Sequence, residues 1–208
     1  MGLANYGELK TAIQDLINRQ DVTSVVPDFV LMLEETVNRE TRLRNRRMEA
    51  TATLSFTGDT ATLPTDFLEV RTAVYLSSPR VRLEYMAPAQ FENTYTVDTA
   101  GQSINYTLEG NNFRAGPVPA LASGVRLNYY QRLTALAADS DTNWLLTYHP
   151  SIYLYGSAMH SAPYLGEDPR LQTWIGLYDR AVAEVQSDDS RARFSGAPLT
   201  PTLSVNVV

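Results

Sequence analysis

The sequence contains no cysteine and only two histidines among its 208 residues. The absence of cysteine excludes disulfide bonds and thiol catalysis, and it removes the softest zinc ligands. No apolar run is long enough to cross a membrane, and no basic stretch followed by an apolar segment indicates a secretory signal at the N-terminus. These absences, together with the chain length, favour a protein with a sizeable core and no membrane partner.

Motifs for catalysis and cofactor binding are also missing. The two histidines, His149 and His160, are eleven residues apart and lack the spacing of a zinc-binding helix. Gly-rich phosphate loops and the serine nucleophile elbow do not occur. Two adjacent carboxylate pairs are expected on solvated helix faces, where they cannot converge in a cleft: Glu34–Glu35 and Asp188–Asp189. The sequence therefore predicts that the protein is not an enzyme and has no catalytic, cofactor-binding or metal-binding residues.

Positive charge is scarce and comes almost entirely from arginine. The formal net charge is −6, and Lys10 is the only lysine. A generic nucleic-acid-binding domain is basic, so this balance argues against that class. Arginine favours geometrically defined ion pairs at interfaces, although a GC-rich genome produces the same bias.

The C-terminal part is expected to contain two helices joined by a tight turn. Pro150 and Pro169 suit the first position of a helix, where the missing N–H would be unpaired anyway. Gly166 is a candidate left-handed C-cap of the first helix, and Asp168 is a candidate N-cap of the second. Pro163 is expected to end or kink the first helix.

The first of these helices is apolar on nearly every face. Its apolar residues are Ile152, Tyr153, Leu154, Tyr155, Ala158 and Met159. A helix of this kind is buried on all sides. The sequence therefore predicts that either the N-terminal helices or a neighbouring subunit covers it.

Two further helices are expected before residue 50. The first spans about 5–20, with Asn5 as the N-cap and Glu8 closing a capping box. The second begins at Pro27 and is expected to reach about Met48, with an apolar face that packs into the core.

Three arginines fall together on the polar side of that second helix. Arg39, Arg42 and Arg46 lie within about one sixth of the helix circumference at 3.6 residues per turn. This cluster predicts a contact with carboxylates of a neighbouring subunit, ahead of a contact with DNA phosphate. A solvated face with local glutamate pairs is the alternative interpretation.

From residue 50 the pattern changes to the two-residue alternation of strands. Hairpins are expected over 51–63 and 104–115, a strand over 125–132 and a short helix over 87–94. The predicted fold class is α+β: a four-helix bundle formed by the N- and C-terminal helical pairs, residues 1–49 and 143–193, with an inserted antiparallel β domain, residues 50–142, and an extended C-terminal tail, residues 194–208.

The tail carries no charged side chain and contains two prolines. Such a segment cannot build its own core, but its alternating end can add a strand to the edge of another sheet. We expect it to bind a neighbouring chain through Leu199, Leu203, Val205 and Val207; a disordered terminus is the alternative.

In its order of segments, the chain resembles the head-to-tail adaptor proteins of tailed bacteriophages, also called connector or head-completion proteins. The resemblance covers about residues 5–197. It is strongest in the stretch Leu63-Pro-Thr-Asp-Phe-Leu68 and in the block from Trp144 to Val185. These motifs carry no catalysis, so the order and spacing of the segments give the match its specificity.

The resemblance implies a structural role in the virion neck. Members form a homo-oligomeric ring, usually a dodecamer, between the portal protein and the tail tube or nozzle, and the ring lines the channel for genome ejection. The implied partners are further copies of the chain, the portal, the tail protein, and DNA that passes without sequence-specific binding. Synthesis is expected in the host bacterial cytoplasm. The alternatives are a tail gatekeeper or tube-completion protein, or a non-viral helical binding module.

Overall fold

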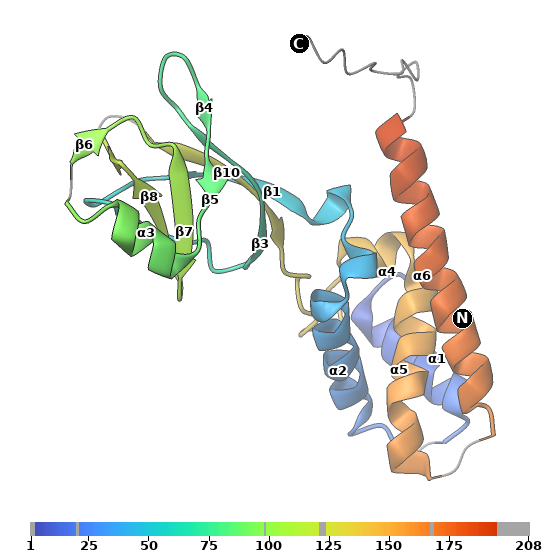
Figure 1. Ribbon diagram of the computed structural model, residues 1–208. Coiled ribbons are helices and arrows are strands. Elements are labelled where there is room, and N and C mark those ends of the chain that lie inside the picture. The colour runs from blue at the N-terminus through green and yellow to red at the C-terminus, as the bar shows by residue number, and fades with distance from the viewer. Residues whose placement is uncertain (1–2, 20, 98, 121–123, 167–168, 195–208) are drawn as a thin grey trace. The chain divides into compact units, whose positions relative to one another are not determined.

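The computed structural model describes residues 3–19, 21–97, 99–120, 124–166 and 169–194. The chain divides into two compact units (Figure 1). The helical unit combines residues 1–45 with residues 135–208, and the β unit consists of residues 46–134. The domain boundaries inferred from the sequence, at 49/50 and 142/143, stay a prediction, because compactness does not show that a segment folds independently.

Helix α5 lies at the centre of the helical unit and packs against α1, α2, α4 and α6 (Figure 1). The elements are α1 (Tyr6–Ile17), α2 (Val26–Arg39), the 3₁₀ turn η1 (Thr41–Leu43), α4 (Trp144–Tyr148), α5 (Pro150–Leu165) and α6 (Leu171–Phe194). The N-terminal helices therefore cover much of the apolar surface of α5, as one of the two sequence interpretations required. Burying that surface is the main favourable term for this unit.

The start of α1 follows the expected capping pattern. The Asn5 side chain accepts a hydrogen bond from the backbone N–H of Glu8 at 2.9 Å. The Glu8 carboxylate accepts one from the backbone N–H of Ala4, also at 2.9 Å. Two N–H groups near the helix start are thereby paired, which is the purpose of a capping box.

Helix α2 is shorter than the sequence suggested. It ends at Arg39 and does not reach Met48, because Glu40 adopts an extended conformation with φ −76° and ψ 110°. The guanidinium of Arg44 then turns back and donates to the carbonyl oxygen of Asn38 at 2.6 Å. A basic side chain on the last carbonyls stabilises a helix end, so Arg44 replaces the helical bonds that a longer α2 would have made.

The two C-terminal prolines have different outcomes. Pro150 occupies the first turn of α5, as predicted, whereas α6 begins at Leu171 and not at Pro169. Pro163 lies inside α5, which continues to Leu165, so the expected end of the helix at this proline is wrong. The predicted cap Asp168 lies outside the described residues.

The β unit contains two four-stranded sheets and a two-stranded one among its described residues. Their strand orders are β1-β10-β3-β4, β2-β8-β7-β5 and β6-β9. The strands are β1 (Glu49–Leu54), β2 (Thr60–Thr62), β3 (Phe67–Tyr75), β4 (Val81–Arg82), β5 (Glu84–Tyr85), β6 (Ala100–Gly101), β7 (Asn105–Glu109), β8 (Asn112–Gly116), β9 (Val118–Pro119) and β10 (Val125–Gln131), with η2 (Arg46–Met48) before β1 and α3 (Pro88–Thr94) after β5. Their inward side chains form one core, in which Tyr106 stacks on Phe113.

The predicted fold class, a four-helix bundle with an inserted antiparallel β domain, is wrong, although the protein is α+β. The described residues form six α helices and three sheets, and not a four-helix bundle with one antiparallel insert. A separate helix, α4, precedes Pro150, since a proline has no N–H to continue the preceding helix. The pairs β5–β7 and β6–β9 are parallel. Strands β5, β6 and β9 have two residues each, which is too short to give a periodic signal.

Strand pairing also corrects one of the two predicted hairpins. The hairpin over 104–115 is confirmed as β7 and β8, which turn at Gly110 with φ 59°. The segments of the other predicted hairpin lie in different sheets: β1 pairs with β10, and β2 pairs with β8. Only an isolated bridge between Thr57 and Thr60 joins the two sides of that turn.

Gly156 sets the closeness of the helices around α5. A Cβ atom at this position would lie 2.4 Å from Cδ1 of Leu33 on α2 and 3.2 Å from Cδ2 of Tyr178 on α6. Leu33 is completely buried, so its side chain has no free space into which to move. Glycine therefore allows α2 and α6 to approach α5 together.

We expect Gly156→Ala to destabilise the protein by up to about 2 kcal/mol, since overpacking a core costs about 1–3 kcal/mol and the better helix propensity of alanine returns about 1. The matched control is Gly176→Ala in α6, where no atom lies within 4 Å of the added Cβ. That change should stabilise the protein by up to about 1 kcal/mol. Urea denaturation of both variants tests the contrast, and two shifts of the same sign would contradict it.

Candidate interaction surfaces

A buried carboxylate joins three segments of the helical unit. Glu34 on α2 is 4% exposed, and its Oε1 accepts hydrogen bonds from Tyr153 Oη at 2.9 Å and from the backbone N–H of Leu136 at 3.1 Å. Asn143 in turn donates to Tyr153 Oη at 2.7 Å and accepts from the N–H of Leu146 at 3.0 Å. The expectation that the Glu34–Glu35 pair is solvated is therefore wrong for Glu34.

The electrostatics of this network follow from its burial. Burial raises the pKa of Glu34, while the hydrogen bonds from Tyr153 and Leu136 act in the opposite direction. Burial also raises the pKa of the Tyr153 hydroxyl, and the nearby Glu34 charge adds to that shift. Tyr153 therefore stays protonated and donates a hydrogen bond to the Glu34 carboxylate. The network has donors matched to acceptors, as buried polar groups require, and its role is to hold the fold.

The histidines do not combine into a metal site. His160 on α5 lies 3.4 Å from the Thr36 hydroxyl, and burial, with a smaller contribution from Arg39, lowers its pKa. His149 separates α4 from α5, with its ring edge-to-face to Trp144. In the part of the chain that the structure describes, no three metal-ligating side chains come together.

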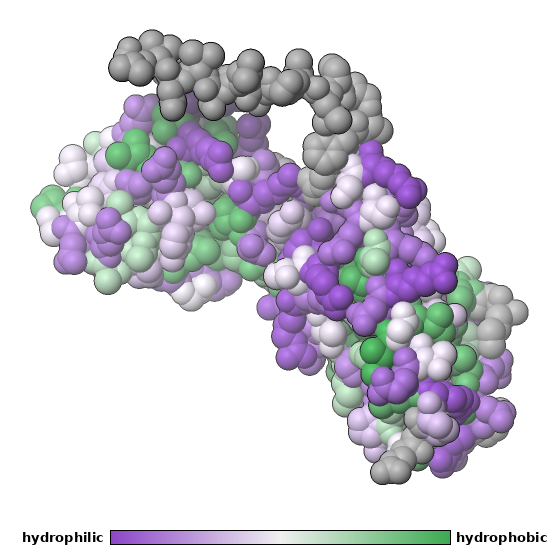
Figure 2. Space-filling view, turned by 45° about the vertical axis from the view of Figure 1, so that its right-hand side comes forward, coloured by the Kyte–Doolittle hydropathy of each residue, from purple (hydrophilic) through white to green (hydrophobic). Residues whose placement is uncertain are grey.

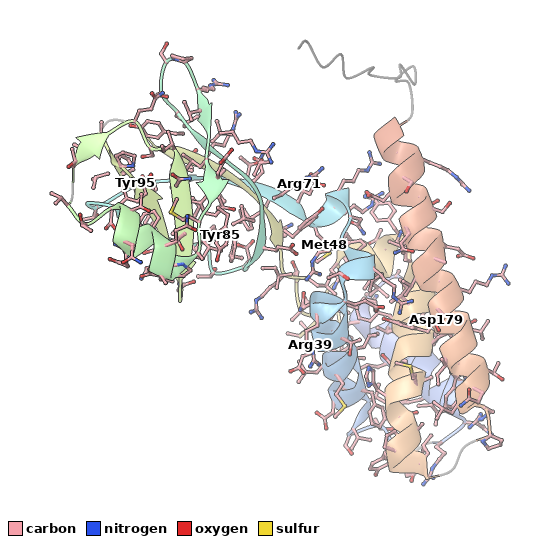
Figure 3. The ribbon with its side chains drawn as sticks, viewed as in Figure 1. Arg39, Met48, Arg71, Tyr85, Tyr95 and Asp179 are labelled. Carbon is pink, nitrogen blue, oxygen red and sulfur yellow. The ribbon has the colours of Figure 1, made fainter. Side chains whose placement is uncertain are left out.

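The three arginines proposed as an interface do not share one helix. Arg39 ends α2 and is exposed, with its guanidinium 3.6 Å from the Glu35 carboxylate (Figure 3). Arg42 lies in η1, pairs with Glu40 and reaches Asp179 on α6 at 3.3 Å. Arg46 starts η2 and belongs to the β unit. The predicted cluster depended on a helix that continues to Met48. Because α2 ends at Arg39, the three arginines do not lie on one helix face.

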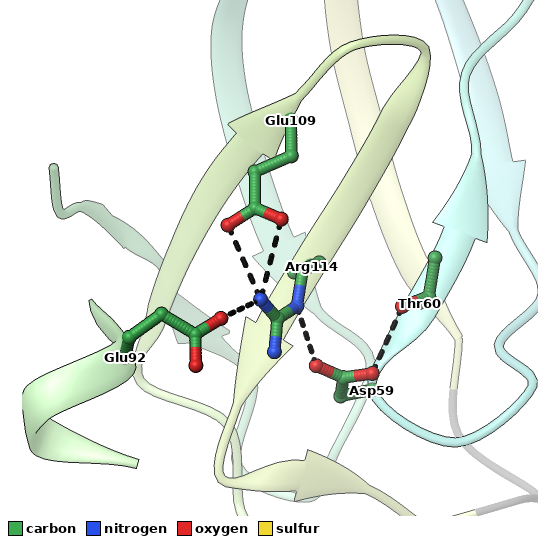
Figure 4. A network of polar contacts seen from close by, with 5 residues as sticks. All are labelled: Asp59, Thr60, Glu92, Glu109 and Arg114. Carbon is green, nitrogen blue, oxygen red and sulfur yellow. Dashed lines mark hydrogen bonds and ion pairs between the residues drawn. The ribbon is translucent and has the colours of Figure 1, made fainter. Parts of the chain in front are cut away.

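In the β unit, a second arginine network links four segments (Figure 4). Arg114 on β8 donates to Asp59 at 2.6 Å and to Glu109 at 3.1 Å, and it contacts Glu92 on α3. Its guanidinium also lies over the Phe91 ring at 5.2 Å. The Glu92 contact is the largest cause that raises the pKa of Arg114, which is charged at any relevant pH. One cation thus holds three carboxylates, and the arrangement is structural.

An apolar groove lies between α5 and α6, at the end of the helices where they join. It has a volume of about 700 Å³ and is lined by Met159, Ala162, Pro163, Gly166, Pro169, Leu171, Gln172 and Ile175. Figure 2 shows hydrophobic residues among the hydrophilic ones on the visible face of the helical unit. No sequence pattern predicted this groove. The one signal was the missing polar face of α5, which its helix neighbours do not cover completely.

The other predicted binding residues lie in the C-terminal tail. Leu199, Leu203, Val205 and Val207 are outside the described residues. Among the helices that the structure describes, none is long and apolar enough to cross a lipid bilayer. The described surface therefore offers the groove, the exposed end of α2 and the arginine pairs as sites for protein partners.

The chain thus consists of a helical unit and a β unit, each with its own buried core and polar network. The model of one family, described as SU10 adaptor protein, matches residues 4–202. The match covers nearly the whole chain, so the chain belongs to the SU10 adaptor family, a family of phage head-to-tail adaptors. The resemblance noted in the sequence is thereby confirmed. No curated protein matches the chain.

Membership makes the chain a structural adaptor protein of a bacteriophage, and the family implies a place in the virion neck in association with portal and tail components. The non-viral binding module is thereby set aside. An adaptor has to contact other proteins on at least two sides. The exposed surfaces of each unit are therefore where its function has to be located.

Replacing Glu34 should separate its hydrogen bonds from its charge. Glu34→Ala leaves the Tyr153 hydroxyl and the Leu136 N–H without an acceptor, so we expect a loss of about 2–4 kcal/mol at about 1–3 kcal/mol per buried unpaired group. Glu34→Gln keeps an acceptor and should cost less than about 1 kcal/mol. Glu35→Ala is the matched control on the exposed face and should stay within about 0.5 kcal/mol. Urea denaturation measures all three.

The same variants predict a pH dependence. A raised folded-state pKa means that the folded protein binds the Glu34 proton more tightly than the unfolded chain does. The corresponding stability is complete below the ordinary pKa of 4.5 and is lost as the pH rises through the raised value. Glu34→Gln should therefore gain stability relative to the wild type as the pH rises above 4.5. A difference between the two that is constant with pH would refute this assignment.

Proposed function

We propose that copies of this chain form a closed ring between the portal and the tail tube or nozzle. The observation that carries the proposal is the match to an adaptor family along residues 4–202, without a large unmatched segment that would supply another activity. Identical copies close into a ring when each presents two different, complementary faces. A chain with an apolar groove and separate exposed apolar residues has faces of that kind.

The proposed ring surrounds the channel through which DNA leaves the head. The net charge of −6 supports this part, because a wall that repels phosphate does not hold the passing DNA. Within the proposal, the uncharged tail, residues 194–208, is the contact to the portal, with Leu199, Leu203, Val205 and Val207 as anchors. Strand addition to a sheet edge would pair its backbone groups.

Mass photometry of the purified chain, alone and with its portal, tests the ring. We expect a single large species, twelve copies in the family pattern, that joins the portal. Removing residues 197–208 should leave the melting temperature unchanged but weaken the attachment to the portal. A chain that stays monomeric at every concentration, also beside the portal, contradicts the proposal. Binding to a tail component without the portal would favour the gatekeeper alternative.

Arg39 is the cleanest of the three arginines for testing the subunit contact. Reversing all three charges would also break the internal pairs of Arg42 with Glu40 and Asp179, and so confuse folding with assembly. We expect Arg39→Glu to raise the concentration for half-assembly by about tenfold, because a rim charge contributes modestly. Arg191→Glu is the matched control, an exposed arginine that also has a carboxylate partner, Asp188, on its own helix. Equal effects of both changes would exclude a specific role for Arg39.

A further inference from the structure

The α5–α6 groove requires an apolar occupant. Seven of its eight lining residues have no polar side chain, and Gln172 on the rim is the exception. An apolar hollow of this size in contact with water is unfavourable, and its burial by a partner returns free energy. The groove is open to solvent, so the occupant enters from there.

The exposed face of α2 carries a matching pair of side chains. Leu31 is 54% exposed and Met32 is 48% exposed, while the residues on either side of this pair belong to the core. Among the described residues of the helical unit, these are the exposed large aliphatic side chains; Tyr148 and Tyr164 are the exposed aromatic ones. We name Leu31 and Met32, with Arg39 two turns further along the same exposed face, the α2 ridge. The ridge is exposed in the isolated chain, so it does not occupy its own groove.

On each of the two surfaces, a charged residue lies the same number of residues after a residue of the ridge or of the groove. Arg39 follows Met32 by seven residues on α2, and Asp179 follows Gln172 by seven residues on α6. Seven helical residues correspond to about 10 Å along each axis. If α2 of one chain lies parallel to α6 of another with Met32 over Gln172, then Arg39 comes beside Asp179 and joins Arg42, which already reaches this carboxylate within its own chain at 3.3 Å. Figure 3 shows Arg39 on α2 and Asp179 on α6.

We propose that the α2 ridge of one copy inserts into the α5–α6 groove of the next copy, with Arg39 against Asp179. This inference rests on the proposed ring and names the contact that closes it. The two surfaces are different, so the contact is head-to-tail, and repetition by rotation gives a ring without an unpaired end. The apolar pair is the buried centre, and the arginine–aspartate pair lies at the polar rim, as in other protein interfaces.

The α2 ridge is too small to form a stable subunit interface by itself. Stable interfaces bury about 800 Å² on each partner, which is more than two side chains provide. A few buried residues nevertheless contribute most of the binding energy when they fill a pocket. The ridge is therefore the anchor of a larger subunit contact, in which the surrounding residues exclude water.

The absence of cysteine allows a direct test by cross-linking. One chain carries Met32→Cys and a second carries Gln172→Cys; the two are mixed, assembled and treated with a short bismaleimide. We expect cross-linked dimers in the mixture, and a ladder of higher oligomers when one chain carries both changes. Gln186→Cys is the matched control, an exposed glutamine about 20 Å further along α6, and it should not cross-link to Met32→Cys.

The cross-linking results distinguish the proposed contact from other ways of closing the ring. Dimers between the Met32→Cys and Gln172→Cys chains support it. An intact ring without them, or equal cross-linking of Met32→Cys to itself, overturns it and leaves the proposed ring in place. A wild-type chain that forms no ring by mass photometry removes the proposed function, and the inference with it.

A second measurement does not depend on thiol geometry. Met32→Asp places a charge in the apolar groove, so we expect the concentration for half-assembly to rise about a hundredfold, in the range of a central interface residue. Met32→Leu keeps an apolar side chain and should assemble nearly as the wild type does. Unchanged assembly of Met32→Asp, with an unchanged melting temperature, overturns the proposed anchor.

Discussion

The helical unit depends on the buried bond between Glu34 and Tyr153. This bond connects α2 to α5, and the same carboxylate oxygen takes the N–H of Leu136, where the chain returns from the β unit. Through Asn143 the network continues to the first turn of α4. The apolar contacts between these helices pair no donors with acceptors, whereas a buried carboxylate has to find its donors. The network therefore fixes which residues of α2, α5 and the return segment meet.

Local signals in the sequence predicted the parts of the fold that local physics decides. The Asn5 cap, the first turn at Pro150 and the β7–β8 hairpin were all correct, since each depends on a few neighbouring residues. The end of α2 was wrong because Glu40 adopts an extended conformation and Arg44 turns back to cap Asn38, and neither residue carries a typical helix-stop signal such as glycine or proline. The partner of β1 was wrong because β10 is more than seventy residues away, and alternation does not identify a partner strand.

The candidate sites were less predictable than the fold. The arginine cluster was derived from helical spacing, so it was lost when α2 ended at Arg39. Glu34 was assigned to solvent because an adjacent carboxylate pair resembles a polar face, and its burial depends on donors from α5 and from residue 136. The groove between α5 and α6 has no sequence motif at all. The lack of a polar face on α5 indicated only that apolar surface would need cover.

The apolar surface of α5 is covered by its neighbouring helices in some places and left exposed in others. Gly156 lets α2 and α6 come close to α5 near the middle of the helix, where Leu33 and Tyr178 cover it completely. Toward the C-terminal end of α5, the lining residues Met159 and Pro163 have no comparable cover, and the groove opens there. In the proposed assembly, this exposed apolar surface of the single chain is buried when another copy fills the groove. Filling the groove would make the assembled protein more stable than the single chain, which would suit an adaptor protein.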